Sequence, residues 1–68
     1  MTDFSEEIGP RKVGGRYYNG YWGQEYEVLD IETDRSSWPV WQVTIRWADG
    51  REAAHCTAWD TQRDRVVS

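Results

Sequence analysis

Apolar and polar residues alternate most regularly in the segment 39–47, where every second side chain is apolar. One face of the segment carries Trp41, Val43, Ile45 and Trp47, and the other carries Gln42, Thr44 and Arg46. A period of two is typical of a strand with one buried face. We therefore predict a strand over 39–47 that turns its apolar face to the core.

The segment 24–32 also alternates, but its phase changes once. Tyr26 and Val28 are apolar at even positions, whereas Leu29 and Ile31 are apolar at odd positions. One extra residue in a strand moves every later side chain to the other face, which is the effect of a β-bulge. The pattern predicts a bent strand over 24–32 with its bulge near Val28 and Leu29.

An Asp-Gly pair at 49–50 follows the strand 39–47 and is a strong signal for a tight hairpin. A two-residue turn would create three cross-strand pairs: Trp47 with Glu52, Ile45 with Ala54, and Val43 with Cys56. Because the apolar faces then agree, we expect Ala54 and Cys56 to be small core residues. The same register makes His55 a surface residue opposite Thr44.

The rest of the chain is divided by glycines and polar residues. We expect a first strand over 16–18, a loop over 19–23, a polar loop over 33–37, a helical turn over 58–62 and a last strand over 63–67. Residues 1–10 are predicted to form a flexible acidic tail, which Phe4 and Ile8 could instead fasten to the domain. Residues 11–68 then form a single folded domain.

Five short strands, a bent second strand and a tight hairpin resemble the SH3-like barrel. The residues that carry the resemblance are Gly14–Tyr17, Gly23–Val28, Trp47–Arg51 and Ala58–Asp60. The Trp-x-Asp-Gly-Arg hairpin is also similar to those of Tudor and chromo-type barrels. The resemblance is architectural and implies a small all-β, five-stranded SH3-like barrel of bacterial or phage type over residues 11–68. Members of this fold mostly bind peptides, protein surfaces or nucleic acids, but the fold does not determine the ligand.

Composition and charge limit the classes of function. The 68 residues include 5 Trp, 4 Tyr and 1 Cys, so aromatic rings rather than disulfides must build the core. Asp3, Glu6 and Glu7 supply most of the net charge of −4, and the chain after residue 10 is nearly neutral. Such a chain does not resemble a strongly basic nucleic-acid binder. With neither a signal-like start nor a long apolar run, we expect a cytoplasmic protein without membrane partners.

Catalytic and metal chemistry are not expected. His55 and Cys56 are neighbours on a predicted strand, so their side chains point to opposite faces and cannot form a dyad. One His and one Cys are too few for a zinc site. Asp30, Glu32 and Asp34 lack the EF-hand spacing and are better explained as a solvated acidic edge. We expect a protein that is not an enzyme and holds no cofactor and no metal.

Five aromatic residues in loops or at strand ends are the candidate binding residues: Tyr18, Tyr21, Trp22, Trp38 and Trp59. Grouped and exposed rings mark interaction sites, whereas the alternative is a satellite core, in which Trp59 would close one end of the barrel. The first hypothesis is a module that binds a protein or peptide partner, with self-association as one form of it.

Nucleic-acid binding is the alternative function. Arg16, Arg46 and Arg51 are the candidate phosphate contacts, within a wider set of basic residues that includes Arg11, Lys12, Arg63 and Arg65. A ring such as Tyr18 or Trp22 would then stack on bases. A third hypothesis is that the aromatic residues form a cage that binds a methylated lysine, which requires two or three rings around one point.

Overall fold

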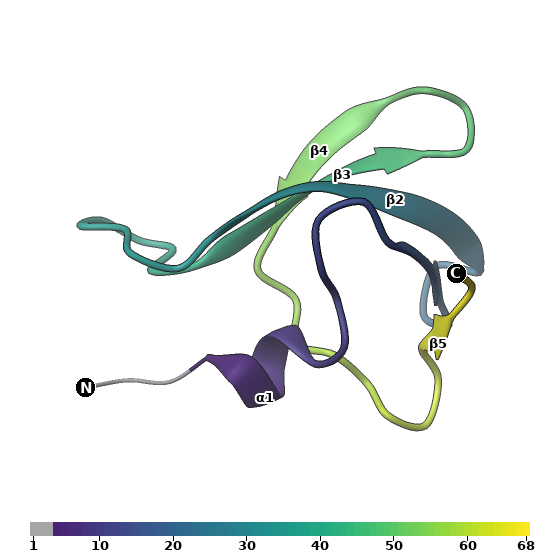
Figure 1. Cartoon of the computed structure of the whole chain (residues 1–68), viewed down its shortest axis with the longest axis horizontal. Helices are drawn as coiled ribbons and strands as arrows, with labels where there is room; N and C mark the ends of the chain where they lie inside the picture. The colour runs from purple at the N-terminus through teal and green to yellow at the C-terminus, as the bar shows by residue number, and fades with distance from the viewer. Residues whose placement is uncertain (1–3) are drawn as a thin grey trace.

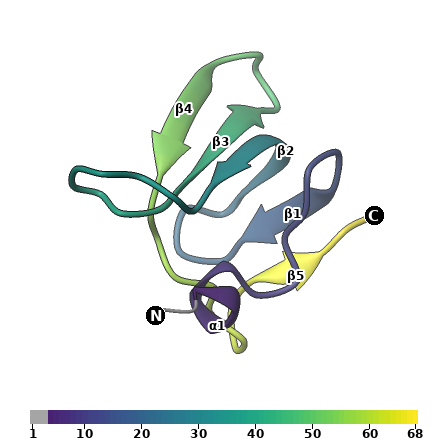
Figure 2. The same cartoon turned by 60° about the vertical axis from the view of Figure 1, so that its left-hand side comes forward.

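Five antiparallel strands form one sheet in the computed structural model, which describes residues 4–68. The elements are α1 (Ser5–Ile8), β1 (Arg16–Asn19), β2 (Gln24–Glu32), β3 (Gln42–Trp47), β4 (Glu52–His55) and β5 (Arg65–Val66). The strands lie side by side in the order β4-β3-β2-β1-β5 (Figure 2). The all-β prediction is confirmed: β4 and β5 are the outer strands of the sheet, and no pairing that would close it into a barrel is found among the described residues.

The predicted bulge in β2 is confirmed. The register between β2 and β3 shifts between Val28 and Asp30. Val28 lies opposite Ile45 before the shift, and Ile31 lies opposite Val43 after it. The inserted residue therefore keeps apolar side chains on the same face of the sheet along the whole of β2.

The turn between β3 and β4 has three residues, not the two that we predicted. The backbone N–H of Trp47 donates to the carbonyl of Arg51 at 2.8 Å, and Ile45 lies opposite Ala53. Gly50 ends the turn with φ of 93°, a left-handed conformation typical of the last position in three-residue hairpin loops. The predicted register was therefore wrong by one residue.

This single-residue difference exchanges the two faces of β4. His55 lies opposite Val43 on the inner face, and Ala53 shares that face, whereas we expected Ala54 and Cys56 there. Ala54 and Cys56 are exposed. The predictions of a core Cys56 and a surface His55 are both corrected for this reason.

Gly50→Val is expected to lower the free energy of unfolding by more than about 1 kcal/mol. A Cβ atom at this glycine would meet nothing within 4 Å, so the loss comes from the positive φ rather than from a clash. Gly50→Asn is the matched control, because Asn tolerates the left-handed region better than Val does. Urea unfolding of both variants checks this, and equal losses would contradict it.

The core lies between the inner face of the sheet and the N-terminal segment, with α1 beneath the sheet (Figure 1). Its buried apolar residues are Ile8, Tyr17, Tyr26, Val28, Trp41, Val43 and Ile45. Phe4 packs against this core, with its ring centroid 6.3 Å from that of Trp41. Residues 1–10 were predicted to be either a flexible tail or a segment held to the domain by Phe4 and Ile8. The contacts of Phe4 and Ile8 match the second interpretation. Residues 1–3 lie outside the described residues.

Arg11 joins α1 to the chain that follows β4. Its side chain is buried, and it donates to the carbonyls of Ile8 (2.7 Å), Glu7 (2.8 Å) and Thr57 (2.8 Å). The backbone N–H of Trp59 adds a further bond of 2.6 Å to the Glu7 carbonyl. Arg11 is therefore a structural tie and is not available to a phosphate backbone.

Candidate binding site

The five candidate rings do not form one groove. Tyr21 and Trp22 precede β2, whereas Trp38 follows it, and a nine-residue strand separates its ends by roughly 30 Å at about 3.3 Å per residue. The loop between β2 and β3, which contains Trp38, projects away from the rest of the molecule (Figure 1). Trp38 is 81% exposed and belongs to a separate surface.

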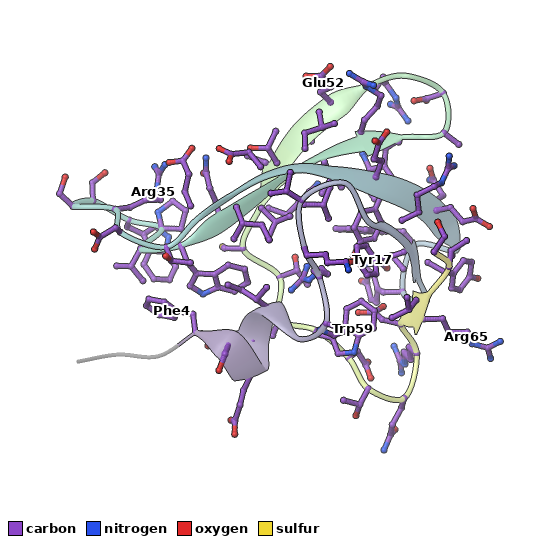
Figure 3. All side chains as sticks on the ribbon, viewed as in Figure 1. Phe4, Tyr17, Arg35, Glu52, Trp59 and Arg65 are labelled. Atoms are coloured by element: carbon purple, nitrogen blue, oxygen red, sulfur yellow. The ribbon has the colours of Figure 1, made fainter. Side chains whose placement is uncertain are left out.

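Among the described residues, Trp59 and Tyr18 make no ring contact with Tyr21 or Trp22, although the Tyr18 hydroxyl lies close to Gly23 at the end of the same loop. Trp59 packs edge-on against Tyr17 at 5.8 Å and is partly buried against the core, inside the molecule (Figure 3). This placement matches the alternative in which Trp59 closes one end of the core. Tyr18 faces away from the buried Tyr17 next to it and lies in register with Arg65, whose side chain points outward in Figure 3.

Four rings do gather at one end of the inner face, and we call Tyr21, Trp22, Trp47 and His55 the aromatic patch. The ring of Trp22 lies 5.2 Å from that of Trp47, 4.9 Å from that of His55 and 6.2 Å from that of Tyr21. Tyr21 is 76% exposed and Trp22 is 39% exposed. Trp22 thus rests on two partly buried rings and presents the rest of its surface, together with Tyr21, to solvent.

Local hydrogen bonds hold the loop that carries the patch. The side-chain oxygen of Asn19 accepts from the N–H of Trp22 at 2.8 Å, and its carbonyl accepts from Gly23 at 2.8 Å. From the turn before β5, the Asp64 carboxylate accepts from the N–H of Gly20 at 3.0 Å. A side chain at Gly20 would overlap the Arg63 carbonyl, so that turn packs directly against the loop. The backbone under Tyr21 and Trp22 is therefore fixed from two sides.

A hollow of about 250 Å³ adjoins the patch and shares one residue, Trp47, with it. The other lining residues are Gln24, Arg51, Glu52 and Ala53. Each charged group in the lining has an opposite partner: Arg51 contacts Asp49 at 2.6 Å, and Glu52 contacts Arg46 at 3.2 Å. The hollow therefore presents little net charge to a ligand.

Two members of the patch were not predicted as binding residues: Trp47, which was expected in the core, and His55, which was expected at the surface. The Nε2 atom of His55 is buried without a hydrogen-bond partner in the described part of the chain. Burial, followed by repulsion from the Arg11 guanidinium, lowers the pKa of His55 below its usual range. The signal that could have found it was the alternative of a three-residue turn, which moves His55 to the inner face.

The candidate phosphate contacts lie mostly in ion pairs. Arg46 contacts Glu52 at 3.2 Å and approaches Glu27 at 4.0 Å. Arg51 is bound to Asp49, and Arg16 is exposed on the outer face opposite Glu27. To bind a phosphate, Arg46 and Arg51 would each have to give up the ion pair with a neighbouring carboxylate.

The exposed Cys56 thiol is expected to react with a thiol reagent in the native protein. This replaces the expectation of a shielded core thiol, because the corrected register turns Cys56 outward. Labelling followed with and without denaturant measures the difference, and similar rates are expected. Strong native protection that disappears on denaturation would contradict the structure.

Comparisons with known proteins identify no relative of this chain. No family model matches the chain, and no match is found among the curated proteins or the solved structures. Across residues 4–68, no group of three or more His, Cys, Asp or Glu side chains could hold a metal ion. Over the same residues, no helix has the length and apolar character needed to cross a membrane.

Proposed function

We propose that this chain is a non-catalytic module that binds a protein or peptide partner through the aromatic patch and its adjoining hollow. The observation that carries the proposal is the exposure of Tyr21 and Trp22 on a loop with a fixed backbone. Tyr and Trp are enriched among the residues that dominate binding energy at protein interfaces. Exposed apolar rings also carry a risk of aggregation that a partner removes.

The fixed loop backbone favours binding in a second way. Ordering a loop on binding costs free energy, and here Asn19 and Asp64 already hold the backbone in place. The compensated charges of the hollow favour a partner segment with little net charge of its own. A second copy of the chain remains one such partner, because β4 and β5 are both open edges.

The resemblance to the SH3-like barrel belongs to the same proposal. Its support is the return of β5 to pair with β1, together with the bulge that bends β2. The cytoplasmic location also remains a prediction. Nucleic-acid binding has less support, since Arg11 is buried and Arg46 and Arg51 are paired. The salt dependence of affinity separates the two functions, because phosphate contacts give a steep slope.

Tyr21→Ala is expected to weaken partner binding by at least about 2 kcal/mol and to leave stability within about 0.5 kcal/mol of wild type. The ring is mostly exposed, so its loss removes little folded-state packing. The partner would first be captured from the native host and purified, and its affinity then measured by calorimetry.

Trp38→Ala is the matched control, because it removes an equally exposed ring at the far end of the sheet. Its affinity and melting temperature should equal those of wild type. Loss of binding in Trp38→Ala but not in Tyr21→Ala would move the site to the loop between β2 and β3 and contradict the proposal.

A further inference from the structure

His55 has a place in the aromatic patch that packing alone does not explain. Its ring lies 4.9 Å from Trp22 and 5.9 Å from Trp47, and its buried Nε2 has no hydrogen-bond partner in the described residues. Most buried polar atoms in native proteins do have a partner, so an unpaired ring nitrogen needs a physical reason.

We propose that His55 controls the patch through its protonation state: neutral His55 supports the ring of Trp22, and protonated His55 turns toward water and releases that ring. This inference rests on the proposed function, since it gives the binding patch a dependence on pH. Both nitrogens of a protonated imidazole are donors, so Nε2 would then need an acceptor, which the described residues do not supply at this place.

The charges around His55 oppose the protonated form. Arg11 acts on it directly, and no carboxylate contributes to the shift of its pKa. On the outer face of β3 and β4, Arg46 and Glu52 form an ion pair with each other, and in the turn between these strands Arg51 is bound to Asp49. Tyr21, whose ring contacts that of Trp22, adds a phenol and no carboxylate. The indole rings of Trp22 and Trp47 favour protonated His55, because a cation over an aromatic face is stabilised.

Trp22 rather than Trp47 is the ring expected to move when His55 is protonated. Trp47 belongs to β3 and is paired with Tyr26 on β2, so its position is set by the sheet. Trp22 lies in a loop and depends on its contacts with Trp47 and His55. Because Asn19 and Asp64 still hold the loop backbone, the expected movement is a side-chain rotation, not unfolding of the loop.

The test is an NMR titration of the whole chain from pH 8 to pH 5, with no partner present. It follows the Cε1 proton of His55 and the indole N–H resonances, with that of Trp22 assigned through Trp22→Phe. We expect both groups to shift with one shared midpoint below 6.5. The indole of Trp38, at the other end of the sheet, is an internal control and should not share that midpoint. In His55→Gln the shift of Trp22 should be lost.

Three results would overturn the proposal. The first is a Trp22 resonance that does not move while His55 titrates, and the second is a His55 midpoint above 6.5, which would mean that the cation–π contacts dominate. The third is a simultaneous loss of the amide signals of Val28 and Val43, which would show that the sheet itself unfolds. These results come from the wild-type chain, so they hold even if His55→Gln does not fold. They leave the proposed function standing, because that function is tested separately by the affinity of Tyr21→Ala and Trp38→Ala for the partner.

Discussion

Arg11→Ala is expected to lower the free energy of unfolding by at least about 3 kcal/mol. Three backbone carbonyls, those of Glu7, Ile8 and Thr57, would lose their common donor. The guanidinium also lies 5.8 Å from the ring centres of both Trp41 and Trp59, so packing and cation–π contacts are lost as well. For a domain of this size, such a loss is a large part of the total stability.

Urea unfolding followed by tryptophan fluorescence measures this effect. Lys12→Ala is the matched control, because Lys12 is the exposed neighbour and its replacement should change stability by less than about 0.5 kcal/mol. Arg11→Lys should lie between the two, since an ammonium group keeps the charge but not the planar fork of donors. If Arg11→Ala unfolds at the same urea concentration as Lys12→Ala, the hydrogen bonds of Arg11 to the three carbonyls do not stabilise the fold.

Tyr17→Ala is expected to cost about 3–5 kcal/mol of stability, as large aromatic truncations in cores do. The ring is fully buried and contacts Tyr26 at 5.9 Å and Trp59 at 5.8 Å. Its hydroxyl accepts from the N–H of Lys12 at 2.8 Å and donates to the carbonyl of Pro10 at 3.1 Å. The residue therefore joins the sheet to the segment that follows α1.

Two further variants divide this effect into its parts. Tyr17→Phe keeps the ring and removes the hydroxyl, so it should cost about 1–3 kcal/mol through the groups left unpaired. Tyr18→Ala removes the neighbouring ring from the opposite face of β1 and should cost less than Tyr17→Ala. Thermal melts of the three variants give the order, and a larger loss for Tyr18→Ala would reverse the assigned faces of β1.

The presence and order of the strands could be predicted from local sequence, although β3 begins at Gln42 rather than at residue 39 and β5 covers Arg65–Val66 rather than 63–67. The bounds of β2 and the place of its bulge followed from the alternation of apolar residues, because a period of two and its change of phase are properties of neighbouring positions. The Asp-Gly pair located the hairpin between β3 and β4 for the same reason. These features require no knowledge of what lies across the core.

The aromatic patch and the buried tie depended on contacts between distant parts of the chain. A turn of two or three residues fits the same Asp-Gly pair, and the three-residue turn is the one that places His55 against Trp22 and Trp47. The carbonyls bound by Arg11 include one that is 46 residues away. The four-residue helix α1 is too short to be stable alone, so its position under the sheet comes from the burial of Ile8. The sequence by itself determined that the strands and the hairpin exist and roughly where they lie, whereas the tertiary structure decided the length of the turn between β3 and β4, which face of β4 is buried and which rings meet, because those choices depend on long-range packing.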